Sequence, residues 1–467
     1  MTVGIPTPSP KLELRPLFHG GERFAPPPVD DERRDARGRS LKPWLAFLTL
    51  LVVGSGMAYS LWWGAVVRHH PWYWVIPSDV WGTVRAAHWV GWGALSYIYS
   101  SHTGLVTLPG FNVLLTPFVM LSSALGLSET APGLPGIPKP QEWLLIGPVI
   151  LACSGVALFA LDRLARRLEL TRNRRVLLSV AATAALWPTI AMWGHPEDVL
   201  ALGLVMYALV AAMNGRLGAA GWLLGGALAM QLYVIALVPL FVGLVGPRKG
   251  AGLLVRATIL PGFLLVAVLV PNFGGSIHAL VDQPNYPTID HATPWVLLAP
   301  KLGHGTVAAG PGRLIGLAVA VGAGVIAFRT RANVRSLAWL CALVLAIRCL
   351  FESVMDPYYV MPVIVVGLGV AAGLSHRRFL TAVVAGAGLT VLTFFHVNMW
   401  AYWFEMVGAL SVLLTAAWPG RWREACVTSP RWPPRPEDLS IGISSRGPSA
   451  REPARSSRSP ASAMGKL

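Results

Sequence analysis

Long apolar runs, separated by short polar connections, fill most of the chain between Pro43 and Trp418. A helix that crosses a bilayer needs roughly 20 mainly apolar residues. We therefore expect an all-α fold, a polytopic bundle of about 12 membrane-spanning helices. The predicted spans are 44–65, 143–164, 176–193, 199–213, 219–231, 232–246, 254–272, 313–328, 336–351, 358–374, 379–395 and 402–418.

The connections alternate between Arg-rich and Arg-poor. Basic residues gather around 165–175, 214–218, 247–250, 329–335 and 375–378, whereas 194–198, 273–312, 352–357 and 396–401 carry few. Lys and Arg are enriched in cytoplasmic loops, so the first set is predicted to be cytoplasmic and the second external. The residues just before the first span include Arg33, Arg34, Arg37, Arg39 and Lys42. Both termini are therefore predicted to be cytoplasmic.

The two ends of the chain are predicted to be disordered cytoplasmic tails, at residues 1–43 and 419–467, on either side of a membrane domain at 44–418. The first tail is polar, Pro-rich and charged, and the second is rich in Ser, Pro and Arg with too few apolar residues to bury a core. The first apolar stretch begins too far from the N-terminus for a secretory signal peptide, and we expect it to be an uncleaved helix.

One further apolar stretch, Leu105 to Leu127, is predicted to lie at the external interface and not to cross the membrane. It contains Pro109 and Pro117, which weaken a spanning helix. A crossing here would also move every later Arg-rich connection to the outside. The segment from Asp79 to Tyr99 has Trp and apolar residues at helical spacing, which is typical of an interfacial helix. The first external loop thus extends from about 66 to 142.

Composition supports a membrane protein and excludes a soluble one. The chain is 54% hydrophobic and only 13% charged, whereas soluble domains have about 25% charged residues. The net charge of +16 comes from residues beside membrane segments, so we expect no nucleic-acid partner. The four Cys residues have neither a zinc-binding spacing nor the pattern of a disulfide framework.

Several short motifs resemble the GT-C superfamily of glycosyltransferases that use polyprenyl-phosphate sugars, in particular actinobacterial mannosyltransferase-like members. These are Asp79 within 77–81, Tyr99 followed by the turn at 108–110, the acidic cluster 194–198 and the small-residue segment 215–225. A Lys common near the end of that segment is Gln231 here, a departure that puts a Lys-dependent phosphate contact in doubt.

The resemblance implies an enzyme of the plasma (inner) membrane that moves a hexose from a polyprenyl-phosphate carrier to a lipid or cell-envelope glycan on the outer face. In the mannosyltransferase-like members this hexose is mannose. The alternative is a polytopic transporter or lipid-carrier flippase without transferase activity. Transporters often show inverted repeats and broken helices near the midplane. Neither an internal repeat nor acidic residues at mid-membrane depth stand out in this chain.

Asp79 is the candidate catalytic base. Sugar transfer to a hydroxyl needs a base within about 2.6–3.2 Å of that hydroxyl, and Asp79 begins the predicted interfacial helix where water and lipid head groups meet. The structural alternative is that Asp79 caps this helix, since Asp commonly accepts hydrogen bonds from the first helical turn. Both roles remain open from the sequence.

His195, Glu197 and Asp198 form a second candidate cluster, between two predicted spans. Ionisable groups at such a place are costly in hydrocarbon and usually line a polar cavity. They are predicted to orient the acceptor or, with Asp79, to hold a divalent cation through oxygen ligands, although the sequence does not require a metal. A solvated turn that caps the next helix is the alternative.

Arg348 is the candidate ligand of the donor phosphate, together with Tyr358 and Tyr359. It falls near the outer end of its span, where Arg is otherwise scarce, and a guanidinium group binds phosphate bidentately. The alternative is an Arg that extends to the interface or pairs with Glu352. Further candidate site residues are Glu352, Asp356 and His291.

Overall fold

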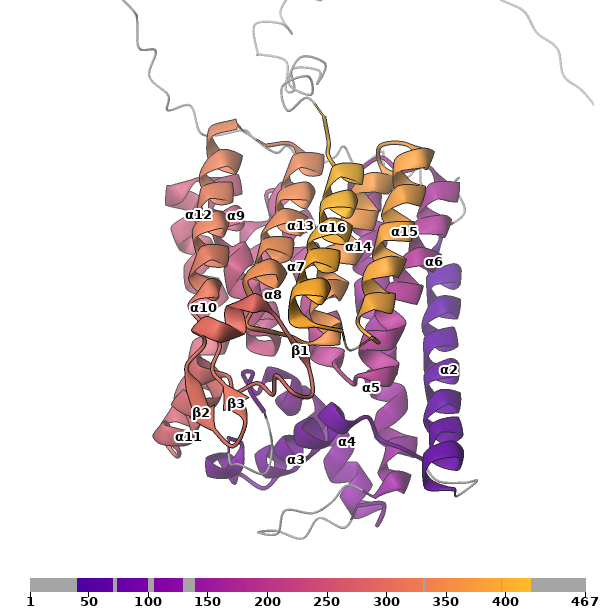
Figure 1. Cartoon of the computed structure of the whole chain (residues 1–467), viewed down its shortest axis with the longest axis vertical. Helices are drawn as coiled ribbons and strands as arrows, with labels where there is room; N and C mark the ends of the chain where they lie inside the picture. Colours follow the sequence, from indigo (N-terminus) through magenta and orange to yellow (C-terminus); the bar gives the residue numbers. More distant parts are fainter. Residues whose placement is uncertain are drawn as a thin grey trace, which may run out of the picture. The chain divides into compact units, whose positions relative to one another are not determined.

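The computed structural model describes residues 40–69, 74–99, 105–128, 139–330, 332–395 and 397–420. Almost all of the predicted tails, 1–43 and 419–467, lie outside these ranges. The described residues form a bundle of helices with only short strands, shown in Figure 1.

Among the described residues, eight helices are long and apolar enough to cross a membrane, by their length and composition. The chain is therefore a multi-pass helical membrane protein, and this part of the prediction is confirmed. These helices are α2 (Lys42–Arg68), α5 (Trp143–Arg167), α6 (Arg172–Trp187), α7 (Pro196–Met213), α10 (Pro247–Leu269), α12 (Gly312–Thr330), α13 (Val334–Phe351) and α16 (Met399–Ala416). Shorter helices occupy the other four predicted spans: α8 (Leu217–Met230), α9 (Val238–Val245), α14 (Met361–Ala372) and α15 (His376–Leu392).

Helical structure is interrupted at Gln231, between α8 and the short 3₁₀ helix η4 (Leu232–Leu237). Gln231 has an extended backbone, with φ −148° and ψ 128°, and its side-chain oxygen accepts a hydrogen bond from the backbone N–H of Leu232. Upstream of the break, α8 packs tightly on α10 because Gly225 lets the two backbones meet; a Cβ there would lie 2.8 Å from the carbonyl oxygen of Ala257.

The Arg-rich connections lie together at one end of the bundle. The guanidinium of Arg335, at the start of α13, donates to the carbonyl of Leu168 after α5 at 3.3 Å. Arg174 of α6 likewise donates to the carbonyl of Ala372 at the end of α14, at 2.9 Å. These hydrogen bonds satisfy carbonyl groups that helix ends leave unpaired, and they join three connections that are distant in sequence.

The opposite end of the bundle carries most of the irregular structure. It includes α3 (Ser78–Gly91), α4 (Gly110–Ala124), α11 (Phe273–Ile277) and two small antiparallel strand pairs, which gather in the lower part of Figure 1. Strand β1 (His291–Ala292) pairs with β4 (Val354–Met355), and β2 (Lys301–Gly303) pairs with β3 (Thr306–Val307). The β1 and β4 pair joins the 273–312 connection to the 352–357 connection.

Helix α4 covers most of the predicted interfacial stretch and packs along α3. The side-chain amide of Asn112 donates to the carbonyl of Thr83 at 2.8 Å, and the hydroxyl of Thr116 donates to the carbonyl of Ala87 at 3.2 Å. Asn112 and Pro117, which are unusual in a lipid-exposed span, thus belong to a helix pair. The position of this pair at a membrane surface stays a prediction.

Helix α3 is further anchored at its far end by a buried ion pair. Nε2 of His88 lies 3.0 Å from Oε1 of Glu142, just before α5, and these side chains are 1% and 0% exposed. Val80 and Val84 of α3 also belong to the main hydrophobic core. Helix α3 is therefore held at a fixed place on the bundle, and with it Asp79 in its first turn.

The arrangement of the two ends gives a topology test. In a Cys426→Ser background, we expect a Lys301→Cys variant to react with a membrane-impermeant maleimide on intact cells, and an Arg172→Cys variant to react only after the cells are opened. Both positions are exposed, and the other Cys residues in the described part of the chain are buried. The reverse labelling would place the 273–312 connection on the cytoplasmic side.

Candidate functional site

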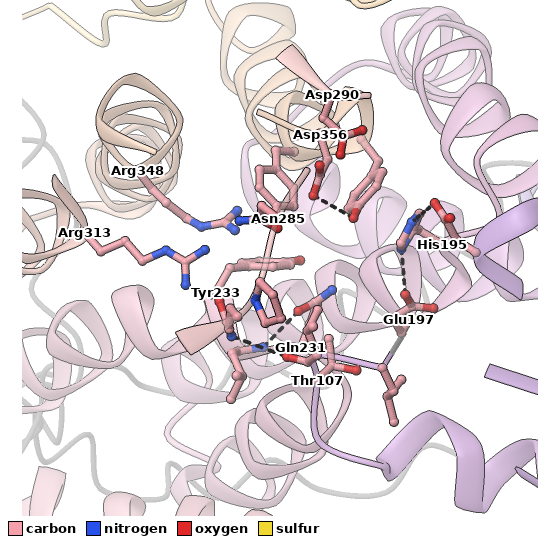
Figure 2. Close-up of a pocket in the computed structure, with 18 of the residues that line it drawn as sticks. Thr107, His195, Glu197, Gln231, Tyr233, Asn285, Asp290, Arg313, Arg348 and Asp356 are labelled. Atoms are coloured by element: carbon pink, nitrogen blue, oxygen red, sulfur yellow. Dashed lines mark hydrogen bonds and ion pairs between the residues drawn. The ribbon is translucent and has the colours of Figure 1, made fainter. Parts of the chain in front are cut away.

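A cavity of about 770 Å³ opens at the end of the bundle that carries α3 and the strand pairs. Its walls come from α3, the connection before α7, η4, the 280–290 segment, α12, the end of α13 and the 3₁₀ helix η7 (Pro357–Val360). Figure 2 shows polar side chains from these separate elements turned toward a common space. The cavity thus brings together most of the predicted site residues.

His195 connects two carboxylates on one wall of the cavity. Its Nε2 lies 2.8 Å from Oδ2 of Asp79, and its Nδ1 lies 2.8 Å from Oε1 of Glu197. Gly194, at φ +78°, makes this approach possible, since a Cβ at that position would lie 2.5 Å from a methyl group of Val80 on α3. The structure therefore brings Asp79 and the 194–198 cluster into one network.

Both nitrogens of His195 must donate hydrogen bonds in this geometry, because an ionised carboxylate only accepts them. Such a His is an imidazolium. Burial by itself lowers the pKa of His195, but the Glu197 carboxylate and the hydrogen bonds to Asp79 and Glu197 raise this pKa well above its usual range. The ring of Tyr358 stacks on the imidazole with centroids 3.4 Å apart and fixes its plane.

Asp79 is not the cap residue of its helix. Pro77 occupies the N-cap of α3, and Asp79 follows in the first turn with its side chain 46% exposed. The carboxylate is thus held by His195 at the cavity wall and remains partly open to solvent, and the sequence-based alternative of an N-cap does not describe its position.

Asp198 is held in place by two residues at and just after the break between α8 and η4. The side-chain amide of Gln231 donates to Oδ2 of Asp198 at 3.1 Å, and the hydroxyl of Tyr233 donates to the Asp198 carbonyl at 3.2 Å. Gln231, at the position where the resembled family commonly has Lys, therefore contacts an acidic side chain at the cavity wall.

Ligand atoms of His195, Glu197 and Asp198 lie within 4.8 Å of one another, a spacing that a divalent cation could use. A doubly donating imidazolium, however, has no lone pair left for a metal. Its positive charge already stands between the Asp79 and Glu197 carboxylates. In this protonation state, His195 is a hydrogen-bond donor to both carboxylates and not itself a metal ligand.

Arg348 forms part of the opposite wall. It lies in the last turn of α13, and its guanidinium carbon is 4.2 Å from the ring centroid of Tyr359 and 5.6 Å from that of Tyr233. Tyr358 and Tyr359, adjacent in sequence, therefore serve different walls, the first at His195 and the second beneath Arg348. Aromatic faces stabilise a cation without using its N–H donors.

A second Arg, which sequence reasoning missed, stands beside Arg348. Arg313, at the start of α12, donates from Nε to Oε1 of the fully buried Glu352 at 2.6 Å and from Nη1 to the side-chain oxygen of Gln283. The argument that identified Arg348 applies equally to Arg313, since both lie at the Arg-poor end of their helices. Gln283 has φ +44°, an uncommon backbone for a non-glycine residue.

Asp290 and Asp356 form a carboxyl pair on a third side of the cavity (Figure 2). Their side chains are hydrogen bonded, and Oδ2 of Asp356 also accepts the Tyr358 hydroxyl at 2.8 Å. Burial and the carboxylates of Asp356 and Asp79 raise the pKa of Asp290 to about 8. Burial also raises the pKa of Asp356, although hydrogen bonds from Tyr359 and Tyr358 oppose the shift. The pair therefore holds a proton at neutral pH.

Three predicted site residues, Asp198, Glu352 and His291, do not line the cavity. The first two are hydrogen bonded to residues that do, whereas His291 is part of strand β1. Its ring is stacked on Tyr402 with centroids 4.3 Å apart, and its Nε2 donates to the carbonyl of Thr393 at 2.9 Å. This buried His supports the β1 and β4 pair, and its neighbour Asp290 is the residue of this connection that reaches the cavity. Nothing in the sequence pattern distinguishes Asp290 from His291 in this respect.

Compared with models of known protein families and with the sequences of curated proteins, the chain matches none. The case for a function therefore rests on the residues of this cavity and on the short motifs of the sequence.

The carboxyl pair predicts a specific pH dependence of stability. The folded protein holds the Asp290 proton more tightly than the unfolded chain, so this group's contribution to stability falls as the pH rises from 3.8 to about 8. Asp290→Asn stays neutral throughout. We expect the melting temperature of Asp290→Asn, relative to the wild type, to rise steadily over this range in detergent micelles.

The matched control for this measurement is Asp282→Asn, which removes a more exposed carboxylate of the same connection that is paired with His278. A constant difference in melting temperature between Asp290→Asn and the wild type across the pH range would contradict a shared proton.

Proposed function

We propose that this protein is a membrane glycosyltransferase that moves a hexose from a polyprenyl-phosphate carrier to a lipid or cell-envelope acceptor. The observation that carries the proposal is that one cavity has two complementary walls. One wall has the Asp79 carboxylate oriented by His195, and the other has the Arg348 guanidinium, which makes no hydrogen bond with a described residue. A base and a phosphate-binding cation are the two groups that this reaction needs.

The rim of the cavity supports a lipid-linked donor. Three apolar lining residues of η4 and α12 are strongly exposed: Ile235 at 49%, Leu314 at 69% and Leu317 at 42%. On the outside of a membrane protein, exposed apolar side chains contact lipid, so their exposure carries no free-energy penalty. A prenyl chain could therefore remain in the hydrocarbon beside α12 while its phosphate reaches Arg348.

In the proposed reaction, Asp79 accepts the proton of an acceptor hydroxyl as its oxygen bonds to the anomeric carbon of the hexose. The bond from that carbon to the phosphate oxygen breaks, and its electron pair leaves with the polyprenyl phosphate. Arg348 stabilises the charge that grows on this phosphate. His195 keeps the Asp79 carboxylate oriented, and the carboxyl pair of Asp290 and Asp356 offers donors and acceptors for sugar hydroxyls.

The proposed topology has twelve spans, both termini in the cytoplasm and the cavity at the external face of the plasma membrane. The gathering of Arg-rich connections at the opposite end supports this orientation. The acceptor would reach the cavity from the aqueous side and the donor from the lipid. Mannose is the proposed sugar on the basis of the resemblance alone.

Asp79→Asn tests the base. Asn keeps the shape of the side chain but cannot take up a proton, so we expect sugar transfer to fall by about 10²–10⁴-fold. The measurement is transfer from a radiolabelled polyprenyl-phosphate hexose in membranes at equal protein level, with Asp282→Asn as the matched control. Near wild-type transfer by Asp79→Asn would refute the catalytic role. Carrier movement across the bilayer without any sugar transfer would favour a flippase.

Arg348→Gln tests the phosphate contact. We expect it to raise KM for the polyprenyl-phosphate donor by roughly tenfold or more, the loss of a charge-assisted hydrogen bond, while the KM for the acceptor stays close to that of the wild type. Arg329→Gln, at the exposed far end of α12, serves as the control. An unchanged donor KM would remove Arg348 from the site.

A further inference from the structure

Glu352 lies between the two Arg residues of the cavity and is fully buried. Its Oε1 accepts from Arg313 at 2.6 Å, whereas its Oε2 lies 3.9 Å from Nε of Arg348 and has no hydrogen-bond partner among the described residues. A buried carboxylate is costly unless it is paired. Glu352 is therefore paired closely with one Arg and only loosely with the other.

The two Arg residues differ accordingly. Arg313 is engaged, through Nε with Glu352 and through Nη1 with Gln283. Arg348, within the described part of the chain, has ring contacts and the long approach to Glu352 but no hydrogen bond. Its side chain is 17% exposed and lines the cavity, so its donors are available to a ligand.

We propose that Glu352 and Arg313 act as positioning residues: Glu352 offsets one of the two Arg charges at this wall and leaves it with a net charge of one, and so selects a carrier with a single phosphate over a diphosphate. This inference rests on the proposed function and specifies its donor. A sugar phosphodiester carries one negative charge, which Arg348 alone can neutralise.

A diphosphate-linked sugar carries two negative charges and would bring the second one close to Glu352. Charges that are poorly solvated interact strongly, since the effective dielectric inside a protein is far below that of water. This wall therefore distinguishes donors by the number of their negative charges more than by their shape.

Four forms of the protein test this by changing the charge in single steps. Glu352→Gln frees a second cation, Arg313→Gln leaves Glu352 to pair with Arg348, and the double variant removes both charges and restores the wild-type balance. The probes are polyprenyl-phosphate hexose and polyprenyl-diphosphate hexose with the same chain, bound to purified protein in nanodiscs. The measured quantity is the ratio of the two dissociation constants.

We expect the wild type to prefer the monophosphate by roughly tenfold or more, the scale of one charge-assisted hydrogen bond. Glu352→Gln should reduce or reverse this preference, and Arg313→Gln should weaken both ligands. The double variant should return toward the wild-type ratio, which loss of fold could not produce. Arg329→Gln, the same change at the exposed end of α12, should leave the ratio unaltered.

An unchanged ratio in Glu352→Gln, or no recovery in the double variant, would overturn the charge selection while tight monophosphate binding still supported the proposed function. Equal binding of both ligands by the wild type would also overturn it. Failure of the wild type to bind either ligand would instead remove the proposed donor, and the selection with it.

Discussion

The network in which His195 bridges Asp79 and Glu197 is the interaction on which the candidate site depends. It joins α3, an element of the first long connection, to the start of α7, a buried helix of the bundle. Ionised carboxylates repel one another, and a positive charge placed between them offsets this repulsion. The imidazolium supplies this charge and at the same time fixes the orientation of Asp79.

The remainder of the fold keeps this junction in place. The His88 and Glu142 pair anchors α3 from its other end, Gly194 gives the space for α3 to approach α7, and the Tyr358 ring holds the imidazole plane. The opposite wall repeats the principle with reversed charges, since Glu352 is the anion that fixes Arg313. On each wall of the cavity, one charged residue thus orients a neighbour of opposite charge, and another charged residue faces the open space.

Sequence reasoning identified Asp79, His195, Arg348 and Asp356 because ionisable residues are rare and costly beside apolar helices. It missed Arg313 and Gln283 as site residues and included His291, which supports a strand pair. Arg313 was overlooked although the argument for Arg348 applies to it as well. Gln283 and His291 lie in the 273–312 connection, whose residues have no helical period from which the direction of their side chains could be read. Which of them reach the cavity follows from the pairing of β1 with β4.

The sequence by itself determined the helical membrane class and the separation of Arg-rich from acidic connections, because both follow from the transfer of side chains between water and lipid. Only the tertiary structure decided which side chains meet. It places Asp79 2.8 Å from His195, 116 positions away, and it places Glu352 close to Arg313 and farther from Arg348. Such pairings depend on how helices pack against one another. Local hydrophobicity sets the place of each helix in the membrane but not which neighbours it meets.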